Sequence, residues 1–210
     1  FKMIIETKIS KKPVIFKKAI KILENRITSV LKNNKPELIW ILEHNNVYTA
    51  GTSFKVSDII DKSIKIIKTN RGGKITFHGK GQIIFYFVIN LNNRKKDIRW
   101  FINIIEKSII YSLKEFGINS YNDEKNIGIW INHKSTTKKI AAIGIKIKKW
   151  VAYHGFAINY SVNLNNFKKI IPCGIKNKDL INISQIKEID KNKFIKLLIK
   201  NFIKYLNNLS

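Results

Sequence analysis

Hydrophobic and polar positions follow two different periods along this chain, and the periods predict its secondary structure. Apolar side chains recur every three or four residues over 14–31, 97–116 and 190–208, which is the spacing of one buried helix face. Pro13 stands near the start of the first stretch and Gly117 follows the second, at positions where these residues begin and end helices. We therefore expect three helices over these ranges.

Other stretches are short, compact and rich in β-branched and aromatic residues, as strands are. The predicted strands are 37–44, 63–69, 82–91, 128–132, 139–149 and 151–164. No internal repeat and no linker rich in Pro and Ser divides the chain, so residues 1–210 are expected to form a single domain. This order of helices and strands predicts an α+β fold with a mixed, largely antiparallel β-sheet flanked by helices.

Composition narrows the class of protein. With 210 residues, of which 44% are hydrophobic, the chain can bury a core without disulfides. The single cysteine, Cys173, cannot form an intrachain disulfide, so we expect a reducing, cytoplasmic location. The longest apolar stretch, 82–91, falls well short of the roughly 20 residues of a membrane-spanning helix, and no membrane association is expected. We expect a monomer.

The formal net charge of +26 suggests a nucleic-acid-binding protein at first sight. However, only four of the 40 basic residues are Arg, the residue that reads bases best, and Lys is spread along the whole chain together with Ile and Asn. We therefore expect a solvated, lysine-rich surface that favours an acidic protein partner and no nucleic acid. Nucleic-acid binding remains the less favoured alternative.

The lone cysteine stands in a setting that suits a nucleophile. Pro172 and Gly174 flank Cys173, and a turn there can present the thiol beside backbone N–H groups; a buried, inert cysteine is the alternative. A thiol with a pKa of about 8.5 is mostly protonated near neutrality, so it needs a base or cation nearby. KKIAAIG at 138–144 offers two lysines before small residues, and only one of them can face the site if the segment is a strand.

Histidine and glycine gather in a second place. The stretch 71–82, RGGKITFHGKGQ, holds four of the ten glycines and one of the four histidines. His78 and His154 are each followed by glycine, and a purely structural role is the alternative for both, whereas His44 and His133 are expected at the surface or in loops. The histidines and the cysteine show no tight spacing, so no metal site is expected.

These pieces resemble one known family. RGGKITFHGKGQ at 71–82, KIAAIG at 139–144, HGFAIN at 154–159 and IIPCGI at 170–175 resemble, in this order, motifs of the lipoyl(octanoyl) transferases, and IWILEH and VYTAG within 39–51 resemble their early strand pair. The similarity runs from about residue 37 to 186. It implies the fold of biotin and lipoate protein ligases. It also implies transfer of an octanoyl group from octanoyl-acyl carrier protein to lipoyl domains of 2-oxoacid dehydrogenase complexes and to the glycine cleavage H protein, as a step of lipoate biosynthesis.

The resemblance also implies roles for individual residues. Cys173 would carry the octanoyl group as a thioester, and Lys139 would act as general acid and base, which requires a partly buried amine. The residues implied to line the octanoyl pocket are Arg71, Gly72, Gly73, Lys74, Ile75, Thr76, Phe77, His78, Ala142, Ile143, Gly144, Gly155, Phe156 and Ala157. No metal, nucleotide or other cofactor is implied.

Three places depart from the family's pattern, and one rival shares its fold. Asn45-Asn46 stands where Pro is common. Lys80 stands where the family has Pro, and Phe77 stands where Tyr is usual, which keeps the ring but removes a hydroxyl donor. The main alternative is an ATP-dependent lipoate or biotin protein ligase, for which Cys173 would have no catalytic role. The two hypotheses differ in whether turnover needs ATP.

Overall fold

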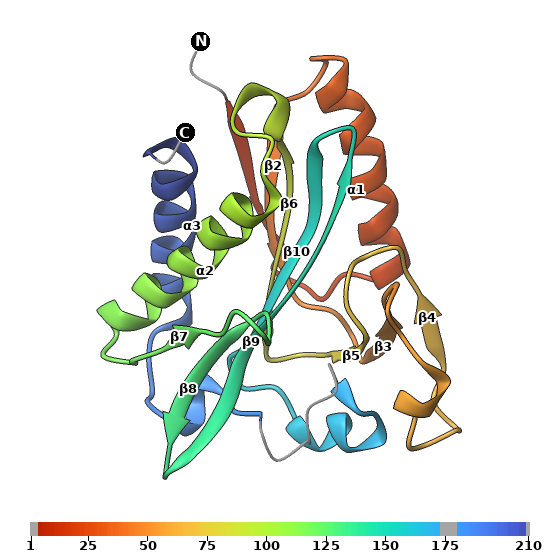
Figure 1. Ribbon diagram of the computed structural model, residues 1–210, viewed down its shortest axis with the longest axis vertical. Coiled ribbons are helices and arrows are strands. Elements are labelled where there is room, and N and C mark those ends of the chain that lie inside the picture. Colours follow the sequence, from red (N-terminus) through yellow and green to blue (C-terminus); the bar gives the residue numbers. More distant parts are fainter. Residues whose placement is uncertain (1–3, 173–179, 209–210) are drawn as a thin grey trace.

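One mixed sheet forms the centre of the molecule in the computed structural model, which describes residues 4–172 and 180–208 (Figure 1). Over these residues the sheet has seven strands in the order β1-β2-β6-β10-β9-β8-β7. Its strands are β1 (Ile5–Ile9), β2 (Glu37–Leu42), β6 (Gln82–Asn90), β7 (Tyr121–Asn122), β8 (Ile129–His133), β9 (Thr136–Lys148) and β10 (Val151–Asn159). β1 and β2 are parallel and the other neighbours are antiparallel, so the expected mixed, largely antiparallel sheet is confirmed.

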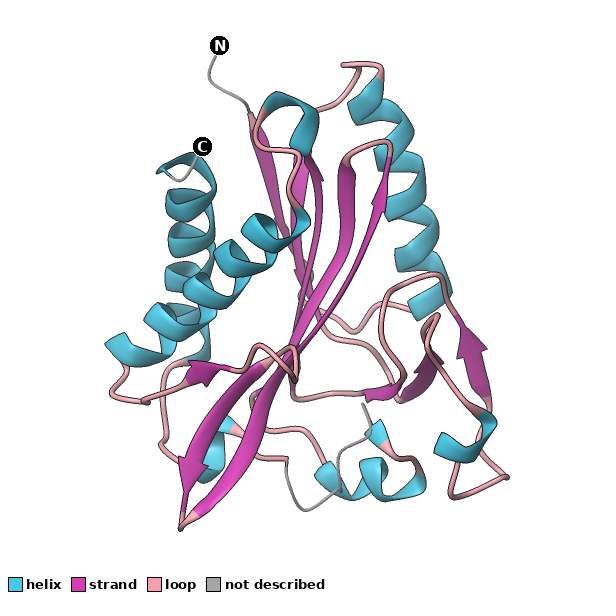
Figure 2. Cartoon of the chain, in the orientation of Figure 1, coloured by secondary structure: helices cyan, strands magenta, loops and turns pink. Residues whose placement is uncertain are grey.

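Helices cover both faces of this sheet (Figure 2). Helix α1 (Phe16–Leu31) lies on one face, and α2 (Ile98–Glu115) and α3 (Lys191–Asn208) lie together on the other. All nine residues of β6 are buried because the strand is covered on both sides. Phe85 and Phe87 pack beneath α2 and α3, whereas Ile84 and Tyr86 face α1. The alternation along β6 thus places Ile84 and Tyr86 on the face that carries the cavity described below.

A small second sheet lies beside the start of α1 (Figure 1). Its order is β4-β3-β5, formed by β4 (Ile66–Lys68), β3 (Val47–Ala50) and β5 (Ile75–His78). Phe77 of β5 packs against Tyr48 and Phe167, with ring centroids 5.1 and 5.4 Å apart. The neighbours of Phe77 in β5, Thr76 and His78, therefore project to the other side, toward the large sheet.

Two hairpins organise the strands that carry the later motifs. The two-residue turns at Lys134-Ser135 and Lys149-Trp150 have positive φ at both positions, between 48° and 60°, as in type I′ hairpins. The long strand β9 pairs with β8 at its start and with β10 at its end. As a result, β9 carries Lys139 beside β8 and Ala142–Gly144 beside β10.

The predicted elements agree with the structure except at some boundaries. The three helices lie within two residues of the predicted ranges at each end. The strand predicted over 151–164 ends at Asn159, and a 3₁₀ helix occupies Leu164–Lys169, because the chain turns away from the sheet after β10. In the strand predicted over 63–69, only β4 pairs with a neighbour. In the described part of the chain, every helix is too short or too polar to cross a bilayer.

Candidate active site

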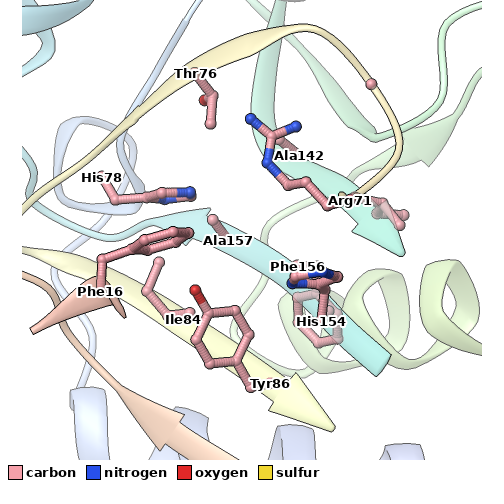
Figure 3. Close-up of a pocket in the computed structure, with 14 residues that line it drawn as sticks. Phe16, Arg71, Thr76, His78, Ile84, Tyr86, Ala142, His154, Phe156 and Ala157 are labelled. Atoms are coloured by element: carbon pink, nitrogen blue, oxygen red, sulfur yellow. The ribbon is translucent and has the colours of Figure 1, made fainter. Parts of the chain in front are cut away.

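A cavity lies between the large sheet, the small sheet and the start of α1 (Figure 3). Its water-accessible volume is about 50 Å³, and its mouth is open to solvent. Most of the residues assigned to the octanoyl pocket line it: Arg71, Gly73, Thr76, His78, Ala142, Ile143, Gly144, Gly155, Phe156 and Ala157. The fold therefore brings together three motifs that are far apart in the sequence, while the binding of octanoyl stays a prediction.

Four of the assigned residues do not line this cavity. Ile75 and Phe77 are fully buried against the 3₁₀ segment on the other side of β5, because alternate residues of a strand point to opposite faces. Gly72 and Lys74 line a neighbouring cavity instead. The prediction treated 71–78 as one continuous lining. The pleat of β5 turns Ile75 and Phe77 away from the cavity, and the loop before β5 carries Gly72 and Lys74 into the neighbouring one.

Four further residues line the cavity without having been assigned to it: Phe16, Ile84, Tyr86 and His154. His154 belongs to a motif that the sequence singled out. Ile84 and Tyr86 lie in a continuous apolar run. The run alone does not show which of its residues face the cavity and which face the core, because this depends on the face of the sheet that α1 covers. No sequence signal marked Phe16, because its contact with the cavity depends on where α1 docks.

Glycine allows unusually close packing around the cavity. A Cβ atom on Gly155 would overlap the carbonyl oxygen of Phe85 on the neighbouring strand. A Cβ atom on Gly144 would lie 3.3 Å from the carbonyl oxygen of Gly72, whose N–H donates to the carbonyl of Ile145 at 3.0 Å. The loop before β5 thus lies directly on β9, which explains the glycine enrichment at both places.

Arg71 fixes that loop to the small sheet. Its Nη2 donates to the carbonyl oxygen and the hydroxyl of Thr49, at 2.9 and 3.0 Å, and its Nη1 donates to the carbonyl of Gly72 at 3.0 Å. The guanidinium therefore places a positive charge at one side of the cavity, where Figure 3 shows it.

His78 is an uncharged hydrogen-bond donor to Gln82 in this site. The Gln82 amide donates to Asn159 at 2.9 Å, so its oxygen accepts from Nδ1 of His78 at 3.1 Å, and Nε2 of the same ring carries no proton. Burial, together with the positive charges of His44 and Arg71, lowers the pKa of His78 to about 3. The ring is therefore uncharged near neutral pH.

His44 lies in the connection between β2 and β3, which agrees with the expected loop, but the expectation of a surface position is wrong. The ring is fully buried, with Nδ1 donating to the carbonyl of Val14 at 2.6 Å and Nε2 accepting from the Tyr86 hydroxyl at 2.9 Å. Burial lowers the pKa of His44 to about 4. The sequence could not show this, because the two partners come from segments remote from His44 in the chain.

His154 sits at a strained point of β10. Its φ of +69° is unfavourable for a residue with a side chain, and its Nε2 lies 2.7 Å from the Asn70 side-chain oxygen. Burial, with Arg71 and Lys146 nearby, lowers the pKa of His154 to about 3. The strain thus occurs where the strand borders the cavity.

Lys139 lies in the adjoining cavity, which shares Gly73, Ile143 and Gly144 with the first one. The side chain is only 4% exposed. Its Nζ donates to the carbonyl of Ile127 at 2.8 Å and lies 4.9 Å from the ring centroid of Trp130. Because three residues line both cavities, the lysine lies in a cavity next to the predicted octanoyl pocket.

Cys173 lies outside the described residues, and its pairing with Lys139 stays a prediction. Leu180, the first described residue after Cys173, forms an isolated bridge with Lys139, and Ile181 donates its N–H to the carbonyl of Lys139 at 3.2 Å. Within residues 4–172 and 180–208, no group of three His, Cys, Asp or Glu side chains is placed to hold a metal ion.

Comparison with known proteins shows several similarities. A family model described as the lipoyl protein ligase A/B catalytic domain matches residues 18–203. The chain is 43% identical to an octanoyltransferase of Rickettsia canadensis over 190 residues, which cover 88% of this chain and 91% of that protein. It is 41% identical to an octanoyltransferase of Wolbachia pipientis, covering 90% of this chain and 97% of that protein.

A solved structure shares the fold. A bipartite lipoate protein ligase of Thermoplasma acidophilum superposes with a TM-score of 0.73, over 97% of this chain and 84% of that one. At 14% identity this likeness concerns the fold alone. It confirms the expected architecture of the ligases.

Proposed function

The chain belongs to the lipoyl protein ligase A/B catalytic domain family, and from this membership we propose that it is an octanoyltransferase of protein lipoylation. It moves an octanoyl group from octanoyl-acyl carrier protein to a lysine of lipoyl domains, in 2-oxoacid dehydrogenase complexes and in the glycine cleavage H protein. The observation that carries the proposal is the 43% identity, over 88% of the chain, to a protein named octanoyltransferase. The single cysteine favours a reducing compartment, so the reaction belongs in the cytoplasm.

The cavity between the two sheets is the octanoyl pocket in this proposal. Small residues, Ala142, Gly144, Gly155 and Ala157, leave space along one wall, and Ile84 and Phe156 supply apolar contacts. Burial of a saturated chain contributes about 0.8 kcal/mol per CH₂, so an eight-carbon chain gains several kcal/mol of binding free energy. Because the saturated chain is uncharged, the pocket needs no charged side chain along its length.

The transfer runs through two acyl exchanges at Cys173. In the first, Lys139 accepts the thiol proton, the thiolate attacks the carbonyl carbon of the donor thioester, and the carrier thiol leaves after taking the proton from Lys139. In the second, the neutral amine of the acceptor lysine attacks the acyl-cysteine and forms an amide. Lys139 takes the amine proton and returns it to the departing Cys173 sulfur.

Two observations support Lys139 in this role. The residue is only 4% exposed, and the role requires a partly buried amine. Its bridge with Leu180 joins it to the segment that follows Cys173 in the chain.

An ATP-dependent ligase remains the rival, because the fold is common to both activities. The likeness to the lipoate ligase structure does not separate them, since it concerns the fold alone. The transferase is favoured because relatives at 41% and 43% identity carry that name and because Cys173 and Lys139 occupy the positions of the family motifs.

Intact-mass analysis after incubation with octanoyl-acyl carrier protein, without ATP, tests the proposal. We expect an octanoyl adduct that hydroxylamine removes, and no adduct on Cys173→Ala. An adduct that persists on this variant would identify another nucleophile, and transfer that strictly requires ATP would reject the transferase.

The role of Lys139 is tested by Lys139→Arg, because arginine keeps the charge but cannot give up its proton. We expect transfer to the lipoyl domain to fall by about 10²–10⁴-fold, the usual contribution of a general base. Lys138→Arg is the matched control, since Lys138 is the adjacent strand residue and points the other way. Equal turnover in the two variants would argue against proton transfer by Lys139.

A further inference from the structure

One end of the cavity is closed by a cluster of aromatic rings, of which Phe16 and Tyr86 lie outside the sequence motifs. Phe16, the first residue of α1, is buried, and its ring centroid lies 5.2 Å from that of His44 and 6.3 Å from that of His78. The rings of Phe16 and His78 are nearly parallel, at 13°. Tyr86 completes the cluster, 5.6 Å from His44. The wall is therefore assembled from segments that meet only in the folded protein.

The opposite end of the cavity leads toward Lys139. Gly73, Ile143 and Gly144 line both this cavity and the one that holds the lysine. Phe16 lines only the first, and Figure 3 shows it on the opposite side of the space from Arg71. An acyl chain whose carbonyl group lies near Lys139 would therefore extend toward Phe16.

The position of Phe16 is fixed by hydrogen bonds rather than by apolar packing alone. His44 donates to the carbonyl of Val14, two residues before Phe16, at 2.6 Å. Val14 also donates its N–H to the carbonyl of Glu43 at 2.8 Å. The other nitrogen of His44 is held by the Tyr86 hydroxyl at 2.9 Å. The backbone that carries Phe16 is thus tied to the sheet, so the ring cannot easily move aside for a longer chain.

We propose that Phe16 is the residue that limits acyl chain length: the methyl end of the bound chain meets its ring, which forms the end of the pocket. This inference rests on the proposed function, because a length limit has meaning only if the cavity holds the acyl group. It adds a specificity-determining residue outside the motifs assigned to the pocket.

The test compares acyl-carrier proteins loaded with hexanoyl, octanoyl, decanoyl or dodecanoyl chains, mixed in equal amounts, and measures the mass of the acyl-enzyme. Phe16→Ala opens the end wall, and each further buried CH₂ is worth about fourfold in affinity. We therefore expect the ratio of decanoyl to octanoyl adduct to rise on the order of tenfold. Phe16→Trp extends the wall into the pocket and should shift the adducts toward hexanoyl.

Phe194→Ala is the matched control. Phe194 is also fully buried, but it lies in α3, where its ring packs against Phe116 rather than against the cavity. This variant loses the same side chain from the core and should keep the wild-type distribution of chain lengths. If Phe16→Ala does not fold, Phe16→Leu must show a smaller shift in the same direction.

The outcomes separate this inference from the proposed function. A wild-type adduct whose length distribution is unchanged in Phe16→Ala and Phe16→Trp would overturn the inference and leave the transferase intact. A shift of the same size in Phe194→Ala would also overturn it. The absence of an adduct on the wild-type protein with every chain length would overturn the proposed function and this inference with it.

Discussion

The Lys139 side chain occupies space that is free because residue 128 is glycine. The substitution Gly128→Ala therefore tests how strongly the rate of octanoyl transfer depends on the position of the lysine. A Cβ atom at residue 128 would overlap Cε of Lys139 and lie 3.0 Å from its Nζ. It would also lie 2.7 Å from the backbone oxygen of Ala141, which cannot swing away. The lysine must therefore leave its present position in the Gly128→Ala protein.

Two effects of different size follow from this geometry. Gly128 has a φ of +138°, a conformation that strains a residue with a side chain by about 1–3 kcal/mol. In a chain of this length each kcal/mol lowers Tm by about 2–4 °C, so we expect a loss of about 2–12 °C. A displacement of a reacting group by about 1 Å can lower the rate about 10²-fold. Octanoyl transfer should therefore fall by about 100-fold in a protein that still folds.

Gly117→Ala separates the two effects. Gly117 also has a positive φ, +76°, but a Cβ atom there would meet only the end of the flexible Lys187 side chain, at 3.3 Å. This control should lose a similar amount of stability and keep its transfer rate. The measurements are Tm by calorimetry and octanoyl transfer to a lipoyl domain at saturating substrate. Equal losses of rate in the two variants, or full activity in a folded Gly128→Ala protein, would refute the reasoning.

Two further predictions concern stability. The pKa values of His44, His78 and His154 lie near 4, 3 and 3 in the folded protein, below the ordinary 6.5, so the unfolded chain binds more protons between these values. Urea unfolding should show a constant free energy of unfolding above about pH 6.5 and a loss of about 1.4 kcal/mol per pH unit and per histidine from there down to about pH 4. His154→Asn, which tolerates the positive φ, should reduce that slope, and an unchanged slope would contradict the assignment. Arg94 forms a buried, two-pronged ion pair with Glu37, at 2.6 and 2.7 Å, so Arg94→Met should lower the free energy of unfolding by about 3–5 kcal/mol. The exposed neighbour substitution Lys95→Met should change it by less than about 1 kcal/mol, and similar losses in the two variants would count against the buried pair.

The sequence by itself determined the features that depend on local spacing. Helices α1, α2 and α3 were predictable because an amphipathic helix repeats every 3.6 residues, whatever it packs against. The same holds for β6, whose continuous apolar run indicates a strand buried on both faces. The resemblance to the lipoyl(octanoyl) transferases implied that the motifs around Arg71, Ala142 and Gly155 line one pocket, and these residues do line one cavity. Glycine is needed there because backbones approach closely.

The tertiary structure alone decided which side chains share a space. His44 is buried because Val14 and Tyr86 satisfy both of its nitrogens, and neither partner is near it in the sequence. Phe16 reaches the cavity only because α1 docks on the face of the sheet that carries Tyr86. Pairing across a sheet and docking of a helix join residues that are remote in the chain, and a one-dimensional pattern shows which residues are apolar but not which of them meet.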